Sequence, residues 1–419
     1  MTTACLDVGS TWTKGAVVTA DGELLATAQH RTTPPEVLNG LGEVLVAMGK
    51  ADEVLVCSSA GGGLRLAVVG QERLISAEAG YRVALSAGAK VVHVSSGPLA
   101  NVRDLWAARP DVILLVGGTD GGDTKVLLHN AAKLARNRVK APIVLAGNVR
   151  VQGVVLEILA GRTVIATDNV LPDVGELAPG PAREAIRSVF LKHVIGGKGL
   201  SRGPRFQQLV RAVTPDAVLR GVAHLAALHE EPVLVVDVGG ATTDVYSSVS
   251  TQDDQGAVGL PVDRRTVEGD IGMRWSARGI VAEAVAERLI TSGELQAQAD
   301  QRATEIDFVP TTTEESDVDL KLASLAAVVA VRRHLAMGPL GPRGAGLIVL
   351  SGGVFRHADD VTPVADALQG DPVLRAVLKH AKVVVDRDYV LAPAGLLVQE
   401  GRVDTAERLL ADRLGDGLA

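Results

Sequence analysis

Short apolar runs separated by glycine and polar turns open the chain. Three of them are predicted as strands, at residues 4–8, 13–18 and 24–29. The Asp21-Gly22 pair between the second and third runs is typical of a β-hairpin. We therefore expect a β-meander, followed by a helix over 36–48 and a strand over 53–58.

From about residue 85 the pattern changes to apolar strands that alternate with helical stretches. Strands are predicted at residues 91–95, 112–116, 143–146 and 164–167, with helices at 126–138 and 152–160. This alternation is typical of a doubly wound sheet. We expect an inserted α/β subdomain that ends in a proline-rich linker at 172–181, with a helix at 182–194 after it.

The opening pattern then recurs, with strands predicted at 233–238 and 244–249 around a second Asp-Gly turn. A helix at 215–228, with Thr214 as its N-cap, precedes them. A long helix at 317–336 and a strand at 347–350 follow. We expect the following division of the chain: a first lobe with a connecting helix (1–84 and 176–230), the insert (85–175), a second lobe (231–400) and a C-terminal helix or tail (401–419).

Composition narrows the class of protein. The 419 residues are 47% hydrophobic and 22% charged, which is typical of a folded chain with more than one domain. The formal net charge of −7 argues against nucleic-acid or anionic-membrane partners. We expect a cytoplasmic protein, because the chain opens on a strand without a leader and contains no long apolar run. Cys5 and Cys57 lack metal-ligand spacing and are expected to be buried thiols.

The first Asp-Gly turn, residues 7–14, has the composition of a phosphate site. Asp7 ends a strand, where its carboxylate can hold a water of hydrated Mg²⁺, and Gly9 lets the backbone approach phosphate oxygens. Further candidates for nucleotide binding supply hydroxyl groups or a positive charge: Ser10, Thr11, Thr13 and Lys14. The alternative is an ordinary hairpin with an Asx turn.

The second turn, residues 237–244, repeats this composition with two carboxylates. Asp237 and Asp244 flank the turn. Two carboxylates inside apolar runs cost free energy on burial unless they share a cation. The intervening candidates for nucleotide binding are Gly239, Gly240, Ala241, Thr242 and Thr243. A third turn, Ser351-Gly352-Gly353, follows an apolar strand and suits close approach to adenine or ribose.

These three turns, in this order, resemble the motifs of the actin-like ATPase (ASKHA) superfamily. The resemblance implies two related ribonuclease H-like lobes around a cleft that holds ATP. It assigns Mg²⁺ to Asp7 and Asp237, catalytic roles to these residues and Asp244, and adenosine to Gly352 and Gly353. The residue that orients the attacking water stays open between Asp244 and Asp216.

Four further segments resemble one family within that superfamily, the glutamate mutase (methylaspartate mutase) accessory proteins, also called GlmL or MutL. They lie at residues 112–123, 142–148, 167–172 and 267–274. The resemblance implies an ATP-hydrolysing, chaperone-like protein that reactivates an adenosylcobalamin-dependent mutase. A small-molecule kinase and a nucleotide-gated filament on the same scaffold are the alternatives.

Two of those segments allow more than one interpretation. The loop at 117–123 either contacts a partner or ligand of the insert, or is a tight structural turn. Glu268, Asp270 and Arg274 either contact the nucleotide and steady the cleft, or form internal ion pairs.

Overall fold

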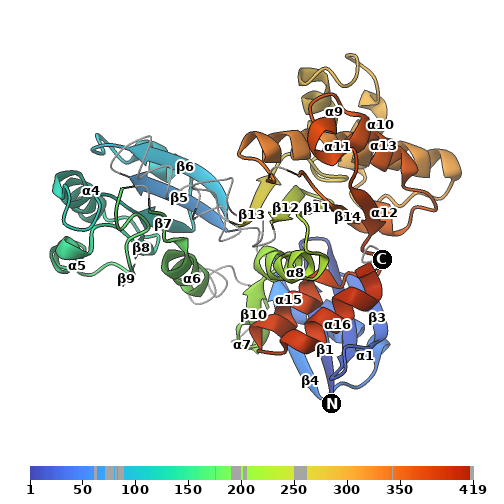
Figure 1. Ribbon diagram of the computed structural model, residues 1–419, viewed down its shortest axis with the longest axis horizontal. Coiled ribbons are helices and arrows are strands. Elements are labelled where there is room, and N and C mark those ends of the chain that lie inside the picture. The colour runs from blue at the N-terminus through green and yellow to red at the C-terminus, as the bar shows by residue number, and fades with distance from the viewer. Residues whose placement is uncertain are drawn as a thin grey trace.

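The computed structural model describes residues 1–60, 64–70, 80, 83, 89–174, 176–189, 200–201, 205–249, 262–341 and 343–415. Three five-stranded sheets form in this part of the chain, and they belong to two lobes and an insert that stands beside them (Figure 1). None of the described helices is both long and apolar enough to span a membrane.

The first lobe is built on a sheet with the strand order β10-β4-β1-β2-β3. The first three strands of the chain pair antiparallel, whereas β4 runs parallel to both β1 and β10. The predicted meander is therefore confirmed. The elements are β1 (Thr2–Val8), β2 (Trp12–Thr19), β3 (Leu24–Arg31), α1 (Val37–Met48), β4 (Glu53–Ser58), α7 (Arg205–Leu209) and β10 (Val210–Val213).

The second lobe repeats this topology in the order β13-β12-β11-β14-β15. Its first three strands are again antiparallel and its last two parallel to the central strand. The strands are β11 (Val233–Val238), β12 (Thr243–Ser248), β13 (Asp263–Glu268), β14 (Leu347–Ser351) and β15 (Lys382–Val385). The helices are α9 (Ala277–Ala286), α10 (Gln296–Thr304), α11 (Thr313–Ala336), α12 (Gly353–Arg356), α13 (Thr362–Gly370) and α14 (Arg375–Leu378).

Helix α11 begins four residues before the predicted start. Its N-cap is Thr312, whose hydroxyl accepts the N–H of Glu315 while the Glu315 carboxylate accepts the N–H of Thr312. This capping box satisfies two N–H groups at the helix start. A Thr followed three residues later by Glu is a signal that the sequence contained.

The insert is a wholly parallel sheet with the order β6-β5-β7-β8-β9. Alternate residues of β7 face opposite sides: Ile113 packs with α4 and α5, and Leu114 with α6, so the predicted doubly wound form is confirmed. The elements are β5 (Arg65–Gly70), β6 (Lys90–Ser96), α3 (Arg103–Ala107), β7 (Val112–Leu115), α4 (Lys125–Arg136), β8 (Ile143–Leu145), η1 (Val149–Val151), α5 (Gln152–Ile158), β9 (Val164–Ala166) and α6 (Pro179–Val189).

The boundaries of the insert differ from the expected 85–175. β5 lies between β6 and β7 in this sheet, so the insert begins before residue 70, and α6 packs on β7 and β8, so it continues past residue 175. An isolated apolar run does not reveal which sheet it will join, because only its pairing partners decide that. The end of the helix predicted at 182–194 and the last residues of the tail, 416–419, lie outside the described residues.

Three helices join the lobes: α8 (Thr214–His229), α15 (Leu391–Gln399) and α16 (Val403–Leu414). α8 packs on β11 and β12 of the second lobe, whereas α15 packs on β1 and β4 of the first, although 391–399 was expected in the second lobe. Their apolar side chains share one core with residues of both sheets, such as Leu55 and Val235.

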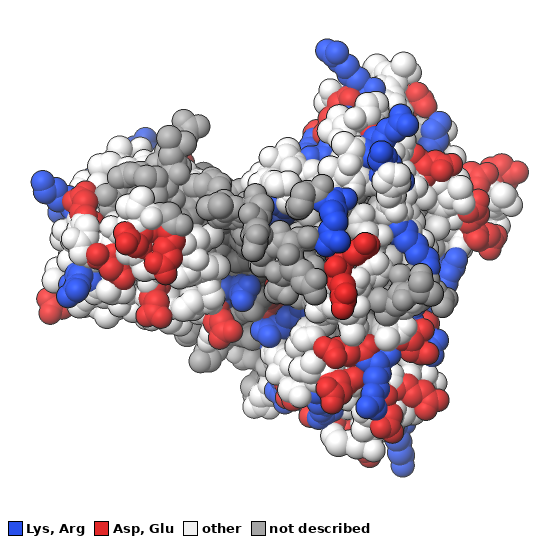
Figure 2. Space-filling view, viewed as in Figure 1, with Lys and Arg blue, Asp and Glu red and all other residues white. Residues whose placement is uncertain are grey.

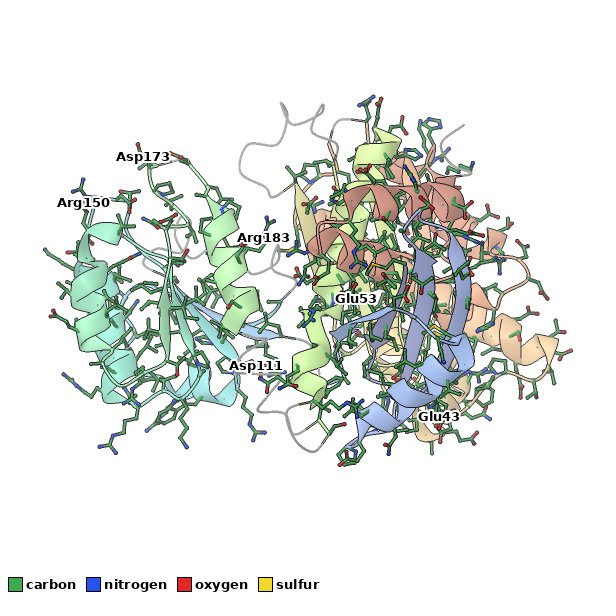
Figure 3. All side chains as sticks on the ribbon, turned by 90° about the horizontal axis from the view of Figure 1, so that it is seen from below. Glu43, Glu53, Asp111, Arg150, Asp173 and Arg183 are labelled. Carbon is green, nitrogen blue, oxygen red and sulfur yellow. The ribbon has the colours of Figure 1, made fainter. Side chains whose placement is uncertain are left out.

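The insert shares an apolar core with the first lobe. Figure 3 shows Arg150 and Asp173 together at one end of it, with Asp111 at the other. These residues follow β8 and β9 and precede β7, so they mark the carboxyl and amino ends of the parallel strands. On the face in Figure 2, acidic and basic side chains are interspersed over the second lobe.

Candidate functional site

The two Asp-Gly turns lie at equivalent positions in the two sheets. Asp7 is paired with Lys14 across β1 and β2, and Asp237 is paired with Asp244 across β11 and β12. Each aspartate therefore ends the central strand of its sheet. The first hairpin places a lysine where the second has a carboxylate.

The turns also share their hydrogen bonding. The N–H of Gly9 donates to the Trp12 carbonyl at 3.0 Å, and that of Gly239 donates to the Thr242 carbonyl at 2.9 Å. A Cβ atom at Gly9 would lie 2.7 Å from the Trp12 oxygen, and one at Gly239 would lie 3.0 Å from the Thr242 oxygen. A side chain at Gly9 would push the turn open, and one at Gly239 would make a tight contact with the turn.

The two turns face each other across the lobes. A Cβ atom at Gly240 would lie 3.2 Å from Oγ1 of Thr11. That hydroxyl is buried and has no hydrogen-bond partner among the described residues. A buried hydroxyl normally finds a partner, so this one is available to a polar ligand held between the turns.

A pocket beside the turns is lined by both lobes. Six of its polar lining residues are Asp7, Lys14 and Thr214 on one side and Asp237, Asp386 and Tyr389 on the other, and Arg356 and Asp388 line it as well. The sequence singled out three of these six residues. Thr214 was predicted only as a helix cap, which is wrong because the N-cap of α8 is Val213. Asp386 and Tyr389 were not predicted as site residues.

Lys14 is one of two positive charges that line the pocket, together with Arg356. Its Nζ lies 3.5 Å from the centre of the Tyr389 ring, a cation–π contact between the lobes. Burial lowers the pKa of Lys14, but Tyr389 and the carboxylates of Asp237 and Asp7 raise it above its ordinary value. The ammonium group therefore stays charged and partly offsets the repulsion between the two carboxylates.

The surrounding carboxyl groups bind protons unusually well. Burial raises the pKa of Asp237 to about 6, although Lys14 opposes the shift. Burial also raises the pKa of Asp386 to about 6 and that of Asp7 above its ordinary value. The two cationic side chains of the pocket, Lys14 and Arg356, do not compensate its four carboxyl groups, so the pocket favours an additional cation.

The donor set fits Mg²⁺. Among the described residues no cluster of three or more His, Cys, Asp or Glu side chains has the geometry of a metal cage. Mg²⁺ does not need one, because it keeps several waters and is held by one or two carboxylates together with phosphate oxygens. Asp7 and Asp237 supply two carboxylates from opposite lobes.

Asp7 is held in place by two neighbours. The hydroxyl of Thr214, at the start of α8, donates to Oδ1 of Asp7, and the thiol of Cys57 lies 3.7 Å from the same oxygen. The Thr214 hydrogen bond lowers the pKa of Asp7 against the effect of burial. The connecting helix thus contacts the first turn directly. Cys5 and Cys57 are buried free thiols, as expected.

Asp244 has a different environment from the other aspartates. Its Oδ1 accepts Nε of the buried Arg265 at 2.7 Å, and its Oδ2 accepts the Thr242 hydroxyl at 3.1 Å. Arg265 was not predicted. Asp216, the other candidate for orienting water, is buried in the first turn of α8, 3.8 Å from Arg220.

Two of the predicted hydroxyl groups form hydrogen bonds with segments that lie behind the turns. Thr13 shares a 3.1 Å hydrogen bond with Thr32, and Thr243 donates to the Ile271 carbonyl at 3.1 Å. Both hydroxyls fasten a hairpin to its neighbouring segment. Among the other predicted residues of the turns, Ser10 is exposed and Ala241 is partly exposed.

The third turn packs on the second. Gly352 has a φ of 117°, and a Cβ atom there would lie 2.3 Å from the Val238 carbonyl oxygen. Only glycine permits this approach. Gly353 begins α12, and Ser351 lines the shared pocket. All three predicted turns therefore converge on one region between the lobes.

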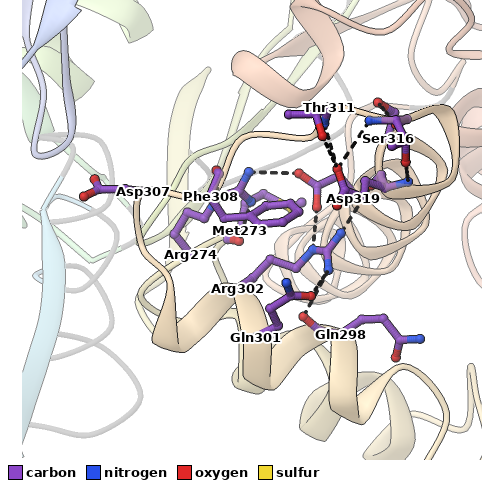
Figure 4. Close-up of polar contacts among 12 residues, drawn as sticks. Met273, Arg274, Gln298, Gln301, Arg302, Asp307, Phe308, Thr311, Ser316 and Asp319 are labelled. Carbon is purple, nitrogen blue, oxygen red and sulfur yellow. Dashed lines mark hydrogen bonds and ion pairs between the residues drawn. The ribbon is translucent and has the colours of Figure 1, made fainter.

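The segment 268–274 steadies the second turn through its backbone and forms internal ion pairs. The N–H groups of Met273 and Arg274 donate to the Gly239 and Gly240 carbonyls at 2.9 and 2.8 Å. The Arg274 guanidinium donates to Asp319 (Figure 4). Glu268 pairs with Arg333 at 2.7 Å instead.

The loop at 117–123 is a tightly fixed turn. The buried Asn148 and Asn169 side chains bond to its backbone, Asn148 through Gly121 and Gly122 and Asn169 through Gly118. Asp120 accepts the N–H of Val149 at 3.0 Å. These bonds support the interpretation as a structural turn.

Two sheets of one topology, each with an Asp-Gly hairpin directed at a shared pocket, define the actin-like, two-lobed fold of the ASKHA superfamily. A family model described as MutL protein matches residues 3–414. The chain therefore belongs to the MutL family, which confirms the resemblance seen in its motifs. The MutL protein of Clostridium tetanomorphum is 36% identical in an alignment of 440 positions, gaps included, that covers 94% of this chain and 95% of that protein.

Solved structures show more distant similarity. A glucokinase of the ROK family from Streptomyces griseus is 11% identical with a TM-score of 0.37, covering 98% of this chain and 99% of its own. Component A of (R)-2-hydroxyglutaryl-CoA dehydratase from Acidaminococcus fermentans is 9% identical with a TM-score of 0.29, covering 100% of both chains. Similarity at this level carries no argument about function.

Proposed function

We propose that the chain binds MgATP between its lobes and hydrolyses it. The observation that carries this proposal is the placement of Asp7 and Asp237, from two equivalent turns, in one pocket between the lobes with Lys14 beside both carboxyl groups. Four carboxyl groups against two cationic side chains leave a need for positive charge that Mg²⁺ would meet.

In this proposal Asp7 and Asp237 hold the Mg²⁺, which supplies positive charge to the β- and γ-phosphate oxygens. Lys14 neutralises charge at the same end of the pocket. The orphaned hydroxyl of Thr11 donates to a phosphate oxygen, with backbone N–H groups of the two turns. Asp244 positions the Thr242 hydroxyl by accepting from it. Gly353, with no tight contact to any described residue at its Cβ position, leaves room for the adenosine, and Gly352 lets the third turn pack against the second.

We further propose that hydrolysis serves an adenosylcobalamin-dependent mutase such as glutamate mutase. Membership of the MutL family over nearly the whole chain supports an accessory role in that enzyme system. Two connecting helices support a mechanical role, because α8 packs on the sheet of the second lobe and α15 on the sheet of the first. Lobe movement on hydrolysis would drive release of a damaged cobalamin, so that an intact cofactor can bind.

Asp237→Ala tests the ATP site. We expect Mg²⁺-dependent ATP turnover to fall by about two orders of magnitude or more, because the site loses one of its two metal-binding carboxylates. The measurement is phosphate release, with circular dichroism to verify folding. Asp366→Ala, an exposed aspartate on α13, is the matched control and keeps wild-type turnover. Wild-type turnover in Asp237→Ala would refute the assigned cleft.

The accessory role is tested with a mutase carrying cobalamin that lacks its adenosyl group. We expect the chain, MgATP and fresh adenosylcobalamin together to restore mutase activity, and the Asp237→Ala variant to fail. Omission of ATP is the second control. Transfer of the γ-phosphate to a small molecule, rather than to water, would instead establish the kinase alternative.

A further inference from the structure

Both turns of the nucleotide site are supported from outside by a neighbouring segment. Behind the first turn, the Thr32 N–H donates to the Thr11 carbonyl at 2.9 Å, and the Thr32 hydroxyl donates to the Gly9 carbonyl at 2.8 Å. Behind the second turn, the Arg274 N–H donates to the Gly240 carbonyl at 2.8 Å. Any movement of these supporting segments moves the turns.

Each supporting segment carries an arginine that reaches the same loop. We call this loop, residues 305–311 between α10 and α11, the strap. Arg31, next to Thr32, donates to the Asp307 carboxylate and, at 3.3 Å, to the Asp307 carbonyl. Arg274 donates through Nε to the adjacent Phe308 carbonyl at 2.9 Å. Two consecutive strap residues thus connect to the two turns.

The strap is anchored firmly to the second lobe. Asp319 accepts from Arg274 at 2.9 Å and from Arg302 at 2.7 Å, and both carboxylate oxygens are used. The Phe308 ring lies beside both guanidinium groups, 5.5 and 4.5 Å from its centre. Arg302 is only 2% exposed, so this end of the strap is part of the protein interior.

The contact with the first lobe is weak by comparison. Asp307 points away from the buried cluster (Figure 4), and its side chain is 77% exposed, against 40% for Arg31. Arg31 also lies over the ring of Trp12, 5.2 Å from its centre, at the end of the first turn. The strap is thus held firmly in the second lobe at Phe308. Its contact with the first lobe is the exposed ion pair between Asp307 and Arg31.

We propose that Arg31 and Asp307 are a positioning pair: together with Arg274 they hold the two nucleotide-binding turns at binding distance. The pair touches no part of the pocket and acts through Thr32 and the first turn. When it breaks, the lobes separate on the strap side while α8 and α15 keep them joined on the other. The predicted effect on nucleotide release rests on the proposed function. The predicted effect on the distance between the lobes does not require a bound ligand.

The expected effects are small because exposed ion pairs are weak and screened by salt. Asp307→Ala should broaden the distance distribution between labels on α1 and α13 in nucleotide-free protein. It should also speed release of a fluorescent ATP analogue by roughly two- to fivefold. In 1 M NaCl the ion pair of the wild type is screened, so wild type should show the same distances and release rate as the variant.

A charge swap separates positioning from general destabilisation. Arg31→Asp should reproduce the effects of Asp307→Ala, and the double variant Arg31→Asp, Asp307→Arg should restore wild-type distances and release rates. The matched control is Asp300→Ala, which removes a similarly exposed ion pair with Arg278 at 2.6 Å within the second lobe, and it should change neither.

The outcomes distinguish the two proposals. If wild type binds no ATP analogue, the proposed function fails, while the label distances in Asp307→Ala still test the pair. If Asp307→Ala leaves those distances unchanged, or the swap does not restore them, the positioning pair is refuted whatever the protein binds.

Discussion

At the residue scale, the pocket concentrates carboxyl groups that resist ionisation. Asp237 has a pKa of about 6 because it is buried, and Lys14 opposes that shift only in part. In the unfolded chain the same carboxyl would ionise near its ordinary value. Without a bound cation, an ionised Asp237 therefore lowers the free energy of unfolding.

The pH dependence of stability tests this cost. The folded-state pKa of Asp237 is raised, so its penalty is absent below pH 3.8, grows as pH rises, and is complete above about 6. Asp237→Asn should therefore stabilise the metal-free protein at pH 8 by up to a few kcal/mol, and by less at pH 5. The measurement is urea unfolding in EDTA. An equal difference at both pH values would contradict the assignment, and Asp366→Asn should show none.

Tyr389 shows a second residue-scale feature. It lies between Lys14 and Arg356, 3.5 and 4.8 Å from its ring centre, and has a φ of 55°. Such a conformation is strained for a bulky side chain. The Asp386 carboxylate accepts the Val390 N–H at 2.9 Å and so fixes the loop that holds this tyrosine over the pocket.

At the element scale, the connecting helices cross with their backbones in contact. A Cβ atom at Gly395 of α15 would lie 1.8 Å from the Ala217 carbonyl oxygen, and one at Gly221 of α8 would lie 2.2 Å from that of Leu391. Each helix thus presents a glycine to the backbone of the other. This crossing fixes the angle between the lobes.

Gly395→Ala should force α8 and α15 apart. We expect a loss of about 1–3 kcal/mol in the free energy of unfolding, the usual cost of overpacking, measured by denaturant titration. Gly42→Ala is the matched control, since Gly42 lies inside α1 with open space around its Cβ position. It should stabilise by about 0.5–1 kcal/mol. If Gly395→Ala left the free energy of unfolding unchanged, the two helices would be able to move apart without cost.

At the scale of the whole molecule, the lobes are joined by one apolar core, by Lys14 against Tyr389, and by the strap. One apolar cluster also runs from the first-lobe sheet into the insert, with Leu6 and Leu114 among its members. A change at the cleft can therefore reach the insert through packed side chains. A ligand that contacts both lobes should stabilise the entire assembly.

Nucleotide should raise the melting temperature only when Mg²⁺ is present. At about one hundred times the dissociation constant, binding contributes about 2.7 kcal/mol, which amounts to several degrees. Differential scanning calorimetry with MgATP and with ATP in EDTA measures the effect. Asp237→Asn should lose the shift, whereas an equal shift in EDTA would remove the metal from the proposal.

The sequence alone predicted both hairpins, the third turn, the helix at 215–228 and the doubly wound insert, because each rests on local periodicity and turn chemistry. Tertiary structure decided the remainder. β5 joined the insert through pairing that its apolar residues could not reveal. Thr214, Asp386 and Tyr389 reached the pocket from segments distant in the chain. Arg265 neutralised Asp244, and Asp307 met Arg31, because charged side chains find partners only when folding brings their elements together.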